Sequence, residues 1–179
     1  VLILTKYYAS SVVGMFSIAF RALSLPMALV SSALSQVLLN KVVDLHNNSP
    51  DTLQTFTIKV FLVLALIVSP TIPIIFFWGE DLFSLVFGKE WTQAGYYAKY
   101  LIIAVAVRFC VSPLSAVMAL SHNLRKGMSW QILYLITITI VLVIFSSKDI
   151  ETLLIAFVLH EIVLYSLYLL LIILSSKSR

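Results

Sequence analysis

The chain has 179 residues, of which 61% are apolar and only 11% are charged, and its mean hydropathy is +1.05. A soluble domain has roughly 45–50% apolar and about 25% charged residues, so this composition excludes a soluble enzyme and a nucleic-acid-binding domain. The net charge of +4 comes from twelve scattered basic residues, which form no run that could follow a phosphate backbone.

Five apolar segments are long enough to cross a membrane as helices. A bilayer core about 30 Å thick needs roughly 20 apolar helical residues to span it. The segments that qualify are residues 11–39, 58–77, 95–120, 128–145 and 152–174. Only a helix satisfies the backbone hydrogen bonds of such segments within lipid. The sequence therefore predicts an all-α, polytopic transmembrane helix bundle with about five complete spans.

The residues between the segments and the start of the chain give two further predictions. Asp81 can cap a short helix over residues 81–87, which has an apolar body and is stopped by Gly88, so we expect a separate interfacial helix there. The chain starts at Val1 within an apolar pattern, without a basic leader region or a cleavage site. We therefore expect residues 1–179 to form a single C-terminal membrane lobe of a longer protein, with an N-terminal lobe ahead of it.

The charges of the loops favour a cytoplasmic C-terminus. In that orientation the inner side holds six basic residues, Lys41, Lys59, Arg125, Lys126, Lys177 and Arg179, and the outer side holds four, Lys6, Lys89, Lys99 and Lys148. The excess agrees with the rule that Lys and Arg accumulate in cytoplasmic loops. The reverse orientation is the alternative.

Three ionisable residues lie deep within predicted spans: Arg21, Arg108 and Glu161. A charged side chain at the bilayer centre costs roughly 2.5–3.5 kcal/mol on insertion scales. We therefore expect all three side chains to face the interior of the bundle or a watery cavity.

Each arginine lies on a stripe of mostly small residues at helical spacing. The first stripe is Ser10, Gly14, Ser17, Arg21, Ser24, Ala28, Ser31 and Ser35, and the second is Ala104, Arg108, Ser112, Ser115, Ala119 and His122. Two such stripes predict a narrow polar path for an anionic substrate, with Arg21, Arg108, Ser17, Ser24, Ser112 and Ser115 as its candidate residues. The alternative is close helix packing, which small residues also allow, with the arginines in structural salt bridges.

Glu161 is the one acidic residue near the centre of a span, and His160 is its neighbour. A carboxylate in this position can carry a coupling proton or bind sodium, so Glu161 and His160 are candidates for coupling to a proton or sodium gradient. The alternative is a neutral acid or one paired with an arginine for structural reasons. No Cys, Asp or second His stands at ligand spacing, so the sequence predicts no metal site and no cofactor.

Motifs of common enzymes are missing from the sequence. It contains no glycine-rich phosphate loop, no His-Glu-x-x-His and no Gly-x-Ser-x-Gly. The sequence therefore predicts a protein that is not an enzyme.

Three stretches resemble bacterial polysaccharide and O-antigen flippases. The first includes Ala19-Phe20-Arg21 followed by Leu25-Pro26, the second is the Phe-Gly-x-x-Trp-x-x-Ala-Gly pattern of residues 87–95, and the third is Ser112-Pro113-Leu114-Ser115. Together they cover roughly residues 5–120, whereas the last two segments are similar only in hydropathy. These flippases belong to the multidrug, oligosaccharidyl-lipid and polysaccharide exporter superfamily.

The resemblance implies that the chain is most of the second lobe of a two-lobed exporter working by alternating access. The implied activity is flipping of an undecaprenyl-diphosphate-linked oligosaccharide across the bacterial inner membrane, for cell-surface polysaccharide such as the O-antigen of lipopolysaccharide. Implied partners are this lipid-linked substrate, membrane lipids, the missing N-terminal lobe and the polysaccharide polymerase machinery, with no nucleic acid. Only Arg21 carries over by matching motif, as an attractor of the diphosphate.

Two other functions stay open from the sequence. A cation-coupled multidrug exporter of the same superfamily would need carboxylates for cationic drugs, whereas these spans offer two arginines and one glutamate. A scaffold of a polysaccharide-assembly complex, which transports nothing, would tolerate leucine in place of both arginines.

Overall fold

The structure is a computed structural model, and it describes residues 4–177. Six α-helices account for most of the described chain: α1 (Ser10–Asn48), α2 (Pro50–Val68), α3 (Thr71–Phe87), α4 (Thr92–Val111), α5 (Leu124–Phe145) and α6 (Ile150–Ser175). Short 3₁₀ helices are η1 (Leu4–Lys6), η2 (Lys89–Trp91) and η3 (Ser112–Ala119). The described residues contain no strand, so the predicted all-α class is confirmed.

Five helical stretches are long and apolar enough to cross a membrane. They are Ser10–Asn48, Pro50–Phe87, Lys89–Ala119, Leu124–Phe145 and Ile150–Ser175. Each overlaps one predicted span, although the third prediction, 95–120, extends one residue past Ala119. The ends differ because polar residues continue a helix until a residue breaks it. The first helix accordingly runs on past the predicted end at residue 39 to Asn48, just ahead of Pro50.

The separate interfacial helix expected over residues 81–87 is not present. These residues form the last turns of α3, which runs unbroken over Thr71–Phe87 and ends at Gly88, where φ is +107°. Gly79, ahead of the expected cap, is buried against Gly95 of α4 and does not interrupt the helix. The break falls earlier, at Ser69-Pro70, where the stretch divides into α2 and α3.

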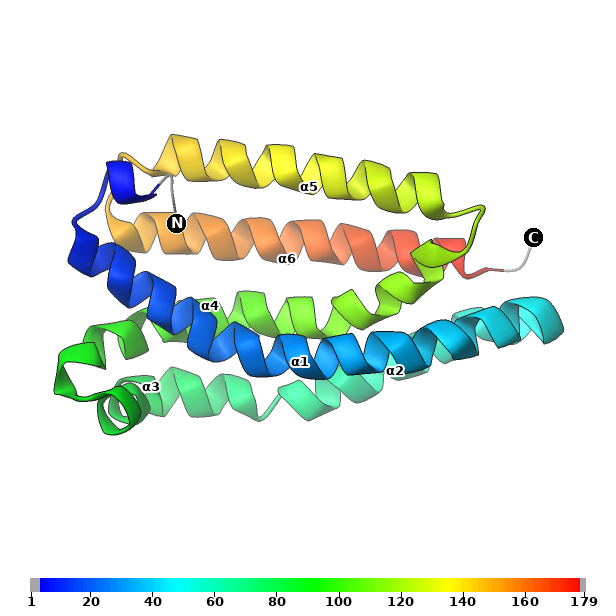
Figure 1. The fold of residues 1–179 in the computed structure, drawn as a ribbon, viewed down its shortest axis with the longest axis horizontal. Helices are drawn as coiled ribbons and strands as arrows, with labels where there is room; N and C mark the ends of the chain where they lie inside the picture. Colours follow the sequence, from blue (N-terminus) through cyan, green and yellow to red (C-terminus); the bar gives the residue numbers. More distant parts are fainter. Residues whose placement is uncertain (1–3, 178–179) are drawn as a thin grey trace.

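Helix α4 lies at the centre of the bundle. It packs against α1, α2, α3 and α6, and most of its residues are buried. Helix α5 lies on the outside, beside α6 (Figure 1). At its C-terminal end α4 passes into η3 at Ser112-Pro113, where the proline removes a backbone donor.

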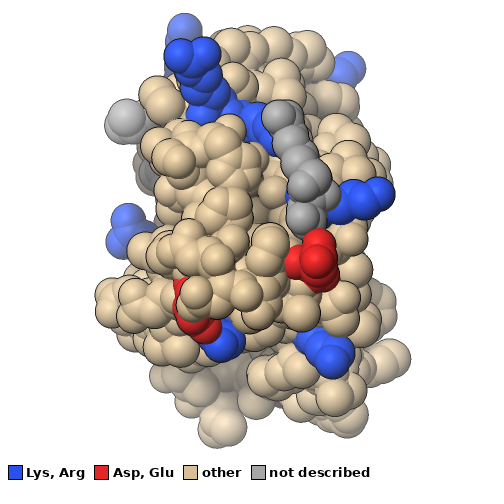
Figure 2. All heavy atoms as spheres, turned by 90° about the vertical axis from the view of Figure 1, so that its right-hand side faces the viewer, with Lys and Arg blue, Asp and Glu red and all other residues tan. Residues whose placement is uncertain are grey.

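The two ends of the bundle differ in charge. One end, on the right in Figure 1, carries the α1–α2 turn, the η3–α5 turn and the end of α6. Its described charged residues are the basic Lys41, Lys59, Arg125, Lys126 and Lys177 and the acidic Asp44 and Asp51. Lys and Arg outnumber Asp and Glu on this face in Figure 2. We call it the basic end.

Candidate functional site

A pocket of about 370 Å³ lies between α1 and α4, near the middle of the bundle. Its walls are Ser24, Met27, Ala28, Ser31, Ser32 and Ser35 of α1, Val105, Arg108 and Phe109 of α4, Ser112 of η3 and Tyr165 of α6. The small side chains recur at helical spacing on one face of α1, so they leave room where a larger residue would fill the space.

Three serine hydroxyls of the α1 wall, those of Ser24, Ser32 and Ser35, donate to carbonyls of their own helix. Ser24 Oγ donates to the Phe20 carbonyl at 2.6 Å, and Ser35 Oγ donates to the Ser31 carbonyl at 2.8 Å. This back-bonding satisfies each proton within lipid and leaves the oxygen able to accept a further hydrogen bond. The α1 wall is therefore polar without being charged.

Arg108 is held by a buried carboxylate on the other side of the pocket. Its Nε and Nη2 both contact Glu161, with 2.9 Å between Nη2 and Oε1. Tyr134 donates to Glu161 Oε1 at 2.6 Å and also contacts Arg108 Nη2. The Glu161 side chain is completely buried, whereas that of Arg108 is 29% exposed. The carboxylate of this ion pair is therefore inaccessible to solvent, whereas the arginine side chain is partly accessible.

Aromatic rings surround the same guanidinium. Arg108 Cζ lies 5.6 Å from the ring centroid of Phe20, 5.7 Å from those of Tyr134 and Tyr165, and 5.9 Å from that of Phe157. A cation at this distance from a ring face is attracted by the ring quadrupole. Side chains of α1, α5 and α6 therefore converge on one arginine of α4.

His160 lies beside this cluster. Its Nε2 is 2.9 Å from Thr137 Oγ1, and its Nδ1 is 3.7 Å from Glu161 Oε1. Nδ1 is buried and has no hydrogen-bond partner in the described part of the chain. The imidazole is therefore near the carboxylate without bonding to it directly.

The predicted site residues do not all meet. Ser24, Arg108 and Ser112 line the pocket, whereas Arg21, Ser17 and Ser115 are not among its lining residues. Arg21 is exposed on α1, one turn from Ser24, and it has no ion pair or hydrogen bond to any residue between positions 4 and 177. Glu161 forms an ion pair with Arg108. This contact is the one expected from the alternative interpretation, in which the acid pairs with an arginine for structural reasons.

Sequence reasoning missed Tyr134, and it did not select Ser31, Ser35 or Tyr165 as site residues. Tyr134 interrupts an otherwise apolar stretch of α5 with a hydroxyl, which needs a partner within lipid. This need for a hydrogen-bond partner could have marked Tyr134 as a candidate site residue. The local sequence around Tyr134 could not indicate that this partner is the Glu161 carboxylate on another helix.

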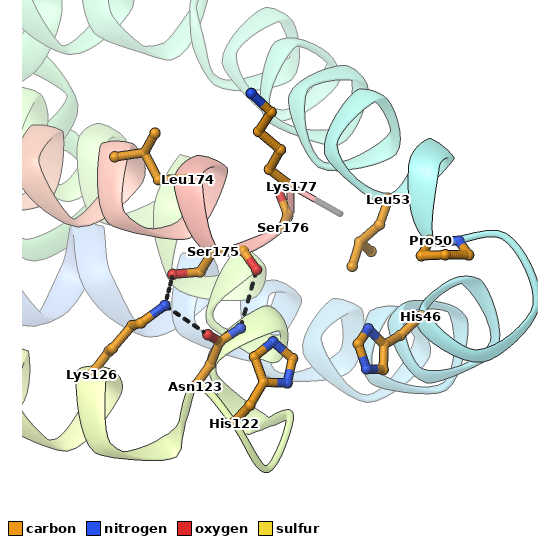
Figure 3. Close-up of a pocket in the computed structure, with 10 residues that line it drawn as sticks. All are labelled: His46, Pro50, Leu53, His122, Asn123, Lys126, Leu174, Ser175, Ser176 and Lys177. Carbon is orange, nitrogen blue, oxygen red and sulfur yellow. Dashed lines mark hydrogen bonds between the residues drawn. The ribbon is translucent and has the colours of Figure 1, made fainter. Parts of the chain in front are cut away.

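A larger pocket of about 660 Å³ opens at the basic end (Figure 3). The rings of His46 and His122 stack there, with centroids 5.1 Å apart. Asn123 Nδ2 donates to the carbonyls of Val117 and Ser175, both at 3.2 Å, which ties the end of α6 to η3. No group of three metal-binding side chains occurs among residues 4–177.

Comparison with known proteins gives one family. Residues 1–95 match the family model described as "Polysaccharide biosynthesis protein". No curated protein and no solved structure matches the chain. The matched region contains α1, α2, α3 and the start of α4, and therefore Arg21 and Ser24, whereas Arg108 and Glu161 lie beyond it.

Proposed function

This chain belongs to the polysaccharide biosynthesis protein family, and from this premise we propose that it is part of a flippase for an undecaprenyl-diphosphate-linked oligosaccharide. The chain would form most of the second lobe of a two-lobed exporter in the bacterial inner membrane, with a cytoplasmic C-terminus. Alternating access of the two lobes would move the cargo for cell-surface polysaccharide synthesis, next to the polymerase machinery. It acts as a transporter and not as an enzyme.

The observation that carries the proposal is the polar pocket between α1 and α4. Serine oxygens line its α1 wall, and a partly exposed guanidinium faces them from α4. Hydroxyl groups of a sugar can donate to the serine oxygens, and oxygens of a sugar or phosphate can accept from arginine.

The two arginines have different roles in this proposal. Glu161 neutralises Arg108, so Arg108 contributes directed donors and no net charge. Arg21 has no such partner among the described residues, so it supplies the positive charge that attracts a diphosphate. Its place one turn from Ser24 would bring the diphosphate to the edge of the pocket.

Coupling to a proton or sodium gradient would use the Glu161 cluster. An incoming ion has to compete with Arg108 for the carboxylate, so binding of the ion would release the guanidinium toward the pocket. Glu161→Gln should then abolish the dependence of transport on the gradient. Unchanged gradient dependence in this variant would leave Glu161 as a structural partner of Arg108.

Two rival functions make different predictions. A multidrug exporter for cations needs an available carboxylate, and the one in mid-span, Glu161, is already bound by Arg108. A scaffold that transports nothing should keep its function when Arg21 and Arg108 are both replaced by leucine. The flippase should lose transport in that double variant.

The test uses the whole protein in liposomes that carry lipid-linked oligosaccharide. The measurement is the accessibility of the sugar to a lectin added on one side, followed over time. We expect protein-dependent movement that Arg21→Ala slows strongly and Arg21→Lys largely preserves, because lysine keeps the charge. Lys59→Ala is the matched control, since it removes one exposed positive charge outside the pocket.

Each outcome separates the hypotheses. Normal transport by well-expressed Arg21→Ala protein would contradict the role of Arg21. No movement by folded wild-type protein with its own cargo would contradict the flippase and favour the drug exporter or the scaffold.

A further inference from the structure

A third pocket is a groove of about 420 Å³ between α5 and α6, near the basic end. Its lining residues are Arg125, Lys126, Ser129, Trp130, Leu133 and Leu171. The polar residues all belong to the first two turns of α5, and Leu133 lies one turn further from the basic end. The groove is therefore polar at its outer end and apolar toward the middle of the bundle.

The polar end of the groove carries positive charge that no acidic side chain neutralises. Arg125 is exposed and makes no ion pair or hydrogen bond with other described residues. Lys126 Nζ donates to Asn123 Oδ1 at 3.1 Å and to Ser175 Oγ at 3.2 Å, and both partners are uncharged (Figure 3). None of the six lining residues is acidic.

The apolar part of the groove has a fixed wall. Trp130 stacks on Tyr168 with 3.8 Å between ring centroids, and its Nε1 donates to the Leu164 carbonyl at 3.4 Å. Leu133 is 48% exposed, and the α5 face continues beyond it with exposed Ile136 and Ile140. This surface suits a hydrocarbon chain that lies along the helix.

We propose that this groove binds an anionic glycerophospholipid of the surrounding membrane. Its phosphate would lie between Arg125, Lys126 and the Ser129 hydroxyl, and an acyl chain would run past Trp130 toward Leu133 and Leu171. Basic pockets between membrane helices recognise anionic headgroups, and tryptophan is favoured at the level of the headgroups. The site is separate from the pocket between α1 and α4, and lipid binding there needs no transported cargo.

The test measures contact between Trp130 and brominated lipids, which quench tryptophan fluorescence when they touch the ring. The whole protein is reconstituted with Trp130 as its one tryptophan, with Trp78, Trp91 and any others replaced by phenylalanine. Vesicles contain a small fraction of brominated phosphatidylglycerol or the same fraction of brominated phosphatidylcholine. We expect phosphatidylglycerol to be enriched about fivefold at Trp130, which corresponds to roughly 1 kcal/mol, the attraction of one basic residue such as Arg125 near the surface.

Two variants of equal charge separate a site from general attraction. Arg125→Gln should remove most of this enrichment, whereas Lys59→Gln, which lies outside the groove, should keep it. Equal quenching by the two lipids in the wild-type background would overturn the proposal. So would retained enrichment in Arg125→Gln or an equal loss in Lys59→Gln. None of these outcomes depends on whether the protein flips an oligosaccharide.

Discussion

The ion pair between Arg108 and Glu161 places two charged side chains within the membrane-spanning part of the bundle. Either charged side chain alone would be strongly unfavourable in lipid, and the two residues lie 53 positions apart in the chain. Tyr134 completes the carboxylate's hydrogen bonding from a third helix. Buried ion pairs gain little over apolar packing, but removal of one partner leaves an unpaired charge, which is strongly unfavourable.

This asymmetry makes a testable prediction at the residue scale. Glu161→Gln should lower the free energy of unfolding by about 3 kcal/mol, because it leaves the guanidinium without a counter-charge. Replacement of both residues, Arg108→Leu with Glu161→Leu, should cost much less than the sum of the two single variants. Thermal unfolding of wild type, Arg108→Leu, Glu161→Leu and the double variant in detergent measures the coupling, and additive losses would contradict a stabilising contact.

Asp149 makes a second prediction, concerning pH. Its carboxylate accepts hydrogen bonds from the backbone N–H and the hydroxyl of Thr152, both at 2.8 Å, at the start of α6. These hydrogen bonds hold the pKa of Asp149 below its ordinary value of 3.8. Since the folded-state pKa is the lower one, the carboxylate stabilises the fold above the unfolded-state pKa. This contribution is lost as the pH falls through the folded-state pKa.

Asp149→Ala should therefore lower Tm at pH 7, and the difference from wild type should shrink as the pH falls below about 3.8. Asp149→Asn is the control, because asparagine also caps helices but does not titrate. A difference in Tm between wild type and Asp149→Ala that is constant with pH would show that the charge of the carboxylate is not what stabilises α6.

At the scale of elements, α3 and α4 form a hairpin whose backbones touch. A Cβ atom on Gly95 would approach the Gly79 carbonyl oxygen and lie 2.6 Å from the Glu80 Cα. Gly88 turns the chain with a φ of +107°, a conformation that residues with a Cβ rarely adopt. Ala94, beside Gly95, is completely buried. The Phe-Gly-x-x-Trp-x-x-Ala-Gly pattern thus has a structural basis in this crossing.

Gly95→Ala should consequently destabilise the protein, by about 1–3 kcal/mol, because the two helices have to separate to admit a methyl group. Gly14→Ala is a matched control on α1, where a Cβ would meet no atom within 4 Å and alanine improves helix propensity. Chemical or thermal unfolding compares the two variants. Equal stability of the two would show that the hairpin tolerates a wider crossing.

At the scale of the whole molecule, charge separates the two ends of the bundle. Among the described residues, the basic end has five basic and two acidic residues. Figure 2 shows more Lys and Arg than Asp and Glu on this face. The opposite end has the four basic residues Lys6, Lys89, Lys99 and Lys148 and the five acidic residues Glu80, Asp81, Glu90, Asp149 and Glu151. The folded bundle therefore gathers the loop charges into one positive and one slightly negative face.

This polarity predicts that the basic end is cytoplasmic. In a Cys110→Ala background, Glu90→Cys should react with an impermeant thiol reagent added outside intact cells. Asn47→Cys, at the basic end, should react only after the membrane is permeabilised. The opposite labelling pattern would reverse the orientation of the bundle.

The sequence by itself determined the all-α class and the number of spans, because hydropathy over about twenty residues depends on composition and not on neighbours. It also singled out Arg21, Arg108 and Glu161, since an ionisable residue within an apolar run stands out locally. The family resemblance rested on the same short patterns, and the match over residues 1–95 confirms the family.

Only the tertiary structure decided which polar groups meet. The partners of Arg108 come from α5 and α6, and its aromatic neighbours come from three helices. Such contacts depend on the rotation and neighbours of each helix, which local periodicity leaves undetermined. The continuity of α3 through residues 81–87 has the same origin, because Gly79 gains a packing partner in Gly95 that the local pattern cannot show.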